Sequence, residues 1–184
     1  VVVHGGGPEI TSFLKQLGKQ TQFVSGLRVT DEETVAIAEM VLVGKINREI
    51  VSLLNHHGAK AVGLSGKDGA LITAKKHLAQ VYENGQMQEV DIGYVGDVET
   101  IQTDILHTLL DSGYIPVVAP IGMGSDQKSY NINADYVAGE IAGALKAEKL
   151  MLLTDVEGIY GNYEDKSTFI STLTLKEAES MIQS

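Results

Sequence analysis

The sequence contains no cysteine, which excludes disulfide bonds, thiolate catalysis and cysteine-ligated metals. It has no apolar run near the roughly 18 residues that a membrane-spanning helix needs, and no signal peptide is visible. We therefore expect a cytoplasmic protein without a membrane partner. Basic residues are also scarce, because 14 Lys and Arg stand against 24 Asp and Glu. Binding to a phosphate backbone needs concentrated positive charge, so we expect no nucleic-acid partner.

The composition is that of a folded domain. A hydrophobic fraction of 43% among 184 residues allows one domain with a sizeable core. Only three prolines interrupt the pattern. The chain opens on a strand-like run at Val1 without an initiator Met, and it ends at Ser184 inside a helical pattern. We expect a single α/β domain over residues 1–184 that is truncated at both ends and belongs to a longer protein.

Short, wholly apolar strands alternate with helices along the chain. This order predicts a mostly parallel sheet with helices on both faces, in which ligands bind at the carboxyl ends of the strands. Expected strands cover residues 1–3, 60–64, 70–74, 114–121 and 149–153, with a strand pair over 22–29 and a hairpin over 80–90 that turns at Asn84-Gly85. Expected helices cover residues 9–17, 30–55, 98–110 and 133–146, and a last helix begins at a capping box formed by Thr174 and Glu177.

The helix expected from Thr30 is the strongest in the sequence. Thr30 and Glu33 match an S/T-x-x-E capping box, and Gly58 is placed to end the helix. Over residues 36–43 apolar side chains cover nearly every face rather than one stripe. Two interpretations stay open, namely a central core helix and a helix packed against a second subunit.

A glycine turn, His4-Gly5-Gly6-Gly7, stands between the first expected strand and the first expected helix. Three glycines let the backbone approach a ligand without a Cβ in the way. The N–H groups at a helix N-terminus then form an anion site. The alternative is a tight turn that binds nothing.

Three named motifs do not fit this chain. A dinucleotide fingerprint would need glycine at Ile10, and a Walker A loop would need glycine at Ala61 and Ser or Thr at Asp68. The G-x-S-x-G elbow of esterases is absent. The histidines have no metal-ligand spacing, and we predict no protein-bound metal.

Six strings spread over the whole chain resemble the amino acid kinase family, and two of them, around Arg28 and Tyr94, look specific to its acetylglutamate branch. In chain order the strings are Val3-His4-Gly5-Gly6-Gly7-Pro8, Gly26-Leu27-Arg28-Val29-Thr30-Asp31, Gly63-Leu64-Ser65-Gly66-Lys67-Asp68-Gly69, Gly93-Tyr94-Val95-Gly96-Asp97-Val98, Tyr130-Asn131-Ile132-Asn133-Ala134-Asp135 and Leu153-Thr154-Asp155-Val156-Glu157-Gly158-Ile159-Tyr160.

The resemblance implies a three-layer αβα sandwich with a central, mostly parallel sheet. It implies that residues 1–145 bind an amino acid and form a homodimer through the long helix 31–55. Residues 146–184 would begin the nucleotide-binding part. The implied activity is an ATP-dependent kinase of arginine biosynthesis that phosphorylates N-acetyl-L-glutamate, with Mg²⁺ carried on the ATP phosphates. Two rival functions stay open: a kinase for a different acidic amino acid, and a non-catalytic sensor domain.

The resemblance also assigns roles to residues. The N–H groups of Gly6 and Gly7 would face the reacting carboxylate and the phosphoryl group. Arg28 would grip the substrate α-carboxylate, which suits its planar fork of donors. Its alternative role is that of an ordinary surface arginine. Asn131 would hold the amide and α-carboxylate end of the substrate, since Asn both donates and accepts. Its alternative role is the N-cap of the next helix.

Asp135 lies four residues after Asn131, which would be one helical turn. In the family the matching Asp orients two lysines that neutralise the transferred phosphoryl group. Neither lysine is in this sequence. We expect one upstream of Val1 and one downstream of Ser184, and we expect the 184 residues alone to be inactive. The nucleotide contacts, which could instead be a plain surface loop, would be Thr154, Asp155, Val156, Gly158, Ile159 and Tyr160.

Overall fold

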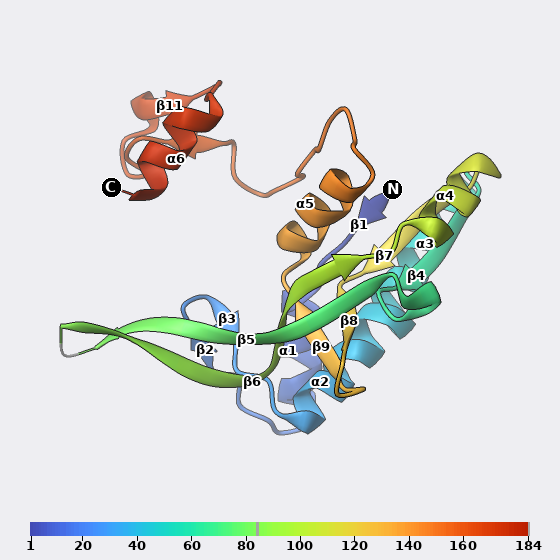
Figure 1. The fold of residues 1–184 in the computed structure, drawn as a ribbon, viewed down its shortest axis with the longest axis horizontal. Coiled ribbons are helices and arrows are strands. Elements are labelled where there is room, and N and C mark those ends of the chain that lie inside the picture. The colour runs from blue at the N-terminus through green and yellow to red at the C-terminus, as the bar shows by residue number, and fades with distance from the viewer. Residues whose placement is uncertain (84, 184) are drawn as a thin grey trace. The chain divides into compact units, whose positions relative to one another are not determined.

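The computed structural model describes residues 1–83 and 85–183 and divides them between two compact units, Val1–Leu150 and Met151–Ser184 (Figure 1). We describe each unit by itself. The hairpin turn expected at Asn84-Gly85 falls partly outside the described residues, because Asn84 is not among them.

The first unit contains the expected parallel sheet. Its strands are β1 (Val2–Val3), β7 (Ile115–Ala119) and β4 (Ala61–Ser65), in the order β1-β7-β4. Both pairings are parallel, with Val118 opposite Val3 on one side and Leu64 on the other. The three strands therefore end at one edge, which is where the glycine turn begins. The predicted α/β fold with a parallel sheet is confirmed.

Helices cover both faces of this sheet. The side chain of Val118 lies in one core cluster with Leu106 and Val137, whereas the next residue, Ala119, lies in another with Leu14 and Leu42. Successive residues of a strand point to opposite faces, so the two clusters are the two sides of the sheet. The helices of the first unit are α1 (Gly7–Gln16), α2 (Glu32–Glu39), α3 (Asn47–His56), α4 (Asp104–Asp111) and α5 (Ala134–Ala144).

Four further strands close into a barrel beside the sheet: β5 (Ile72–Glu83), β6 (Gln86–Ile101), β8 (Ile121–Gly124) and β9 (Ser129–Ile132). The β5–β6 hairpin is the longest feature of Figure 1. The helix predicted from Val98 is wrong over its first residues, because Val98 pairs with Ala74 and Ile101 pairs with Ile72. These ladder bonds hold residues 98–101 in β6, and α4 begins only at Asp104.

The expected strand pair over residues 22–29 is present. Its strands are β2 (Phe23–Val24) and β3 (Leu27–Arg28). The turn between them holds Ser25 at φ 49° and Gly26 at φ 78°. Both angles are those of a tight hairpin turn, which carries Arg28 back alongside Phe23.

The long helix forms, with two differences from the prediction. Its N-cap is Asp31, whose carboxylate accepts a 2.7 Å hydrogen bond from the Thr34 N–H. The capping box at Thr30 is therefore wrong, and the Thr30 hydroxyl instead donates to the Arg28 carbonyl. A π-helical stretch, η1 (Met40–Ile46), also separates α2 from α3. The helix buries one face and exposes the other, where Met40 is 63% exposed.

The second unit is small. It contains β10 (Ile159–Tyr160), a 3₁₀ turn (Lys166–Thr168), β11 (Phe169–Ile170) and α6 (Leu175–Gln183). The predicted capping box is confirmed, because Glu177 accepts from both the N–H and the hydroxyl of Thr174. The strand predicted over 149–153 is wrong. Its backbone pairs with no strand among the described residues, and Leu153 is 93% exposed.

Candidate active site

A cavity of about 350 Å³ opens where β1, β3 and β9 end in the first unit. The glycine turn forms one wall, the β2–β3 hairpin a second, and the segment from β9 into α5 a third. The five residues predicted for the substrate site and the phosphoryl site all line it, namely Gly6, Gly7, Arg28, Asn131 and Asp135. Val95 lines it as well, so the fold brings together four of the six sequence strings.

The glycine turn lies close against the long helix. A Cβ added to Gly6 would come within 2.2 Å of Ile46 Cδ1 and 2.9 Å of Leu42 Cδ2, both on η1. Gly6 is the N-cap of α1, and its N–H has no hydrogen-bond partner within the described part of the chain. A free N–H at a helix N-terminus can bind an anion.

Arg28 is 7% exposed, so it is not an ordinary surface arginine. Its Nη2 donates to the Gly7 carbonyl at 3.0 Å and to the Thr11 hydroxyl at 2.9 Å, and the guanidinium lies 4.8 Å from the Phe23 ring centroid. Its Nη1 is buried and has no partner among residues 1–83 and 85–183. Burial lowers the pKa of the guanidinium. A buried, incompletely satisfied cation favours an anionic ligand.

Asn131 lies on β9, opposite Val95 of β6. It does not cap the following helix, because that role belongs to Asn133, whose side-chain oxygen accepts from the N–H groups of Asp135 and Tyr136. Asn131 and Asp135 are consequently not one turn apart on a helix, as their spacing suggested. One is on a strand and the other in the first turn of α5, and both line the cavity.

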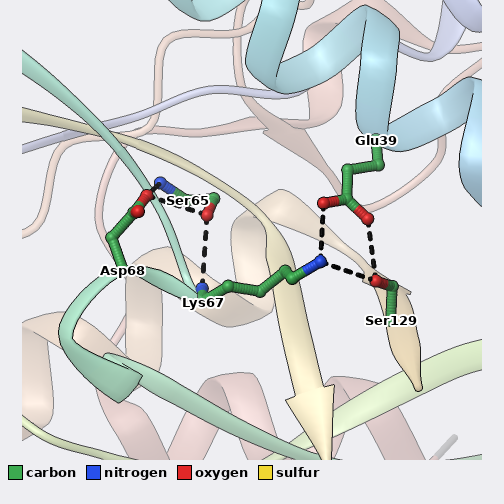
Figure 2. Close-up of polar contacts among 5 residues, drawn as sticks. All are labelled: Glu39, Ser65, Lys67, Asp68 and Ser129. Atoms are coloured by element: carbon green, nitrogen blue, oxygen red, sulfur yellow. Dashed lines mark hydrogen bonds and ion pairs between the residues drawn. The ribbon is translucent and has the colours of Figure 1, made fainter. Parts of the chain in front are cut away.

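A polar cluster of the first unit joins three elements (Figure 2). Lys67, in the turn after β4, donates to Glu39 at 2.8 Å and to the Ser129 hydroxyl at 3.1 Å. Ser129 in turn donates to Glu39 at 2.7 Å. Ser129 and Asn131 lie on the same face of β9, two residues apart, so this cluster fixes the strand that carries Asn131. Sequence reasoning flagged the turn around Lys67 but missed its partners.

The turn itself is tied down by Asp68. Its carboxylate accepts from the N–H of Ser65 at 2.6 Å and from the hydroxyl of the same residue at 2.9 Å (Figure 2). An aspartate at this position explains why the string Ser65-Gly66-Lys67-Asp68 is not a phosphate-binding Walker loop. The Asp68 side chain forms its hydrogen bonds inside the turn. A Walker loop has Ser or Thr at this position, and the hydroxyl faces the bound ligand.

The predicted nucleotide-binding residues lie in the second unit. Within it, the Tyr160 ring contacts the rings of Tyr163 and Phe169 edge-on, and Lys166 Nζ lies 4.5 Å above the centre of the Tyr160 ring. The Tyr160 hydroxyl donates to Glu157, and this hydrogen bond raises the pKa of the tyrosine. Thr154, Asp155, Val156 and Ile159 are exposed, and Gly158 and Tyr160 are half-buried.

Two absences concern only the described residues. Over residues 1–83 and 85–183 no group of three or more His, Asp or Glu side chains is placed to hold a metal ion. Within the same ranges no helix is both long enough and apolar enough to cross a membrane.

The chain is similar to curated proteins named acetylglutamate kinase. It is 57% identical over 183 residues to the one from Moorella thermoacetica and 56% identical over 184 residues to the one from Caldanaerobacter subterraneus. All of this chain is covered in both cases, but only 62% and 58% of the relatives. The chain therefore spans about three fifths of the length of the curated relatives it matches.

A solved structure has the same fold. The N-acetylglutamate synthase of Neisseria gonorrhoeae, solved with coenzyme A and N-acetyl-glutamate, is 27% identical with a TM-score of 0.77. All of this chain and 39% of that chain are covered. The sequence model of the amino acid kinase family matches residues 1–184 of this chain. The glycine turn, the parallel sheet and the match over its entire length together place this chain in the amino acid kinase family.

Proposed function

We propose that this chain contains the amino-acid-binding part and the start of the nucleotide-binding part of a kinase that transfers the γ-phosphoryl group of ATP to the side-chain carboxylate of N-acetyl-L-glutamate. The product would be N-acetyl-L-glutamyl 5-phosphate, an intermediate of arginine biosynthesis. One observation carries the proposal, namely a buried arginine with an unsatisfied Nη1 that shares a cavity with a glycine turn. The names of the relatives that are 57% and 56% identical support it.

The cavity residues suit such a substrate. The Arg28 guanidinium would bind the α-carboxylate, because a charged hydrogen-bond pair is stronger than a neutral one. Asn131 both donates and accepts, as an N-acyl amide requires. The side-chain amide of Asn131 has no hydrogen-bond partner in the described part of the chain, so it is free to bind a ligand. Together these two residues would fix one end of the substrate and leave its side-chain carboxylate facing the glycine turn.

The reaction needs little chemistry from the protein. A carboxylate is ionised and nucleophilic at neutral pH, so no general base is required. A carboxylate oxygen would attack the γ-phosphorus, the bond from that phosphorus to the bridging oxygen would break, and ADP would leave. Positioning and charge stabilisation would supply the rate, and the Gly6 and Gly7 N–H groups would perform that task.

Asp135 and Mg²⁺ complete the proposed site. Asp135 is exposed at the N-terminus of α5 and lines the cavity, where it would orient cationic groups supplied by the rest of the protein. Mg²⁺ would enter on the ATP phosphates, where it neutralises charge, which fits the few protein ligands that this ion usually takes. The exposed loop from Thr154 to Tyr160 would contact the nucleotide.

We also propose a cytoplasmic homodimer formed through the long helix 31–55. Its outer face supports this, because Met40 and Leu53 are 63% and 60% exposed. Exposed apolar side chains of this size are typical of subunit contacts.

An ADP-release assay on the full-length protein tests the proposed function. It would compare N-acetyl-L-glutamate with L-glutamate and L-aspartate at equal concentrations. We expect ADP only with the N-acetylated substrate. ADP with L-aspartate or L-glutamate instead would favour another amino acid kinase, and calorimetric binding of N-acetyl-L-glutamate without ADP release would favour a sensor.

A further inference from the structure

His4 and Asn47 are two buried polar residues that the proposed reaction does not use. Their exposed fractions are 8% and 0%. His4 leads into the glycine turn, and Asn47 is the first residue of α3, directly after η1. The two side chains meet, because Asn47 Nδ2 lies 3.1 Å from His4 Nε2. His4 Nδ1 lies 2.9 Å from the Gly5 carbonyl oxygen.

The surroundings of Asn47 determine which atom of its amide is the nitrogen. Asn47 Nδ2 faces two backbone carbonyls, Val117 O at 2.9 Å and Leu64 O at 3.4 Å. The other end of the amide, Oδ1, accepts from the Arg48 guanidinium. Only an NH₂ group can donate to carbonyl oxygens, so this end of the amide is the donor. The two hydrogens of this NH₂ group serve its two nearest acceptors, Val117 O at 2.9 Å and His4 Nε2 at 3.1 Å, while Leu64 O is farther away at 3.4 Å. An amide nitrogen cannot accept, so His4 Nε2 is the acceptor.

This assignment also determines the state of the imidazole. If Nε2 accepts, a neutral ring carries its proton on Nδ1, and that N–H donates to the Gly5 carbonyl. Burial favours the neutral ring, because it lowers the pKa of His4. A protonated ring would place an N–H against the NH₂ group of Asn47, where two donors would face each other. The Nδ1–H tautomer therefore satisfies both contacts of the ring, with Nδ1–H donating to the Gly5 carbonyl and Nε2 accepting from Asn47.

The hydrogen bond to Gly5 has a consequence for the next residue. The Gly5 carbonyl and the Gly6 N–H belong to one planar trans peptide, in which C=O and N–H point in opposite directions. A carbonyl held toward His4 leaves the Gly6 N–H pointing away from it. Gly6 lines the cavity, and its N–H has no partner within residues 1–83 and 85–183.

We propose that Asn47 and His4 are a positioning pair, which holds the Gly5–Gly6 peptide so that the Gly6 N–H points at the transferred phosphoryl group. Asn47 fixes the ring, and the ring fixes the peptide. The same Asn47 amide donates to the Val117 carbonyl of β7, so the pair anchors the turn to the parallel sheet. This role rests on the proposed function, whereas the tautomer and the peptide orientation do not.

The matched variants are His4→Asn and His4→Leu in the full-length protein. The amide nitrogen of an Asn at this position lies two bonds from Cβ, as Nδ1 does, and can still donate to the Gly5 carbonyl. Leu has a similar size and cannot donate. We expect His4→Leu to lower kcat about 10- to 100-fold, because loss of a preorganised N–H donor costs that much or more. The KM for N-acetyl-L-glutamate should change less than about threefold, and kcat of His4→Asn should stay within about fivefold of wild type.

Nitrogen-15 NMR of the wild-type imidazole gives a readout that needs no turnover. We expect the shifts of the Nδ1–H tautomer, and an Nε2–H tautomer would overturn the proposal. Equal kcat for His4→Leu and His4→Asn, with both variants folded by circular dichroism, would overturn it as well. If wild-type protein shows no turnover, the proposed function fails. The amide shift of Gly6, which should move in His4→Leu and not in His4→Asn, then decides the positioning role.

Discussion

Arg28 Nη2 donates a 3.0 Å hydrogen bond to the Gly7 carbonyl. This contact joins the β2–β3 hairpin directly to the glycine turn, although the two residues come from different strings of the sequence. The guanidinium cannot move without affecting the turn. The distance between the group proposed to hold the substrate and the N–H groups proposed to hold the phosphoryl is therefore fixed by the protein before any ligand binds.

Replacing Arg28 with Ala should raise the KM for N-acetyl-L-glutamate about 10- to 100-fold, which corresponds to the roughly 1.5–3 kcal/mol of a charged hydrogen bond. Steady-state kinetics of the full-length protein measure this. Arg28→Lys is the control, since it keeps the charge and loses the planar fork, and it should recover only part of the loss. An unchanged KM in Arg28→Ala would remove Arg28 from the substrate site.

Gly93 should be the least replaceable glycine of the first unit that adopts a positive φ. Its φ is 85°, and an added Cβ would lie 2.1 Å from the Thr30 carbonyl oxygen, a backbone atom that cannot rotate away. We expect Gly93→Ala to lower the free energy of unfolding by about 3 kcal/mol or more. Gly18→Ala is the matched control, because Gly18 has φ 75° and nothing within 4 Å of an added Cβ.

Urea unfolding of the two variants makes the comparison. Gly18→Ala should lower the free energy of unfolding by only about 1–2 kcal/mol, which is the cost of a left-handed backbone conformation for a residue with a Cβ. Equal losses in the two variants would mean that the approach of Gly93 to Thr30 is not as close as described.

Stability should fall as the pH drops below the ordinary His4 pKa of 6.5. Burial lowers the pKa of His4 in the folded protein, so between the two pKa values the unfolded chain binds more protons, and acid favours unfolding. The hydrogen bond to the Gly5 carbonyl acts in the opposite direction and raises the pKa, but burial is the larger effect. His4→Asn should lose this component of the pH dependence.

Thermal unfolding of wild type and His4→Asn between about pH 7.5 and 5 checks this prediction. The other four histidines are present in both proteins, so their contribution cancels in the difference. Parallel curves for the two proteins over this range would contradict the account of His4 as a buried neutral ring.

The Lys67–Glu39 ion pair should contribute little to stability. Both side chains are 30% exposed, and a pair of this kind contributes about 1 kcal/mol or less. We expect Lys67→Met to lower the free energy of unfolding by about that amount, and a double-mutant cycle with Glu39→Gln to give a coupling of about 0.5–1 kcal/mol. A coupling near zero would show that this ion pair does not join the turn after β4 to α2.

Much of the fold follows from local sequence signals. Short apolar runs such as residues 114–121 predict the strands of the parallel sheet. Three consecutive glycines directly after the apolar run at residues 1–3 predict the glycine turn. Both depend on periodicity and backbone freedom, which neighbours in the sequence determine. The convergence of Gly6, Arg28 and Asn131 on one cavity could not be obtained in this way, and the family resemblance supplied that expectation.

The sequence predictions are wrong where local sequence allows two structures equally well and tertiary contacts determine which of them forms. Thr30 and Asp31 both qualify as caps, and Asp31 prevails because Thr30 lies buried between β3 and β6. Residues 98–101 fit a helix, but β5 offers them a ladder. Asn131 and Asn133 are alike in type, and only the course of β9 decides which of them caps α5. The role of Asn47 has no local signal, because its partners lie on β4, β7 and the glycine turn.

The central claim is that the cavity between the glycine turn and Arg28 holds the substrate. A crystal structure of the full-length protein with N-acetyl-L-glutamate and a non-hydrolysable ATP analogue tests this most directly. We predict the α-carboxylate within hydrogen-bond distance of the Arg28 guanidinium and the γ-phosphate analogue beside the Gly6 N–H. N-acetyl-L-glutamate bound elsewhere in the crystal, with this cavity filled only by water, would contradict the account.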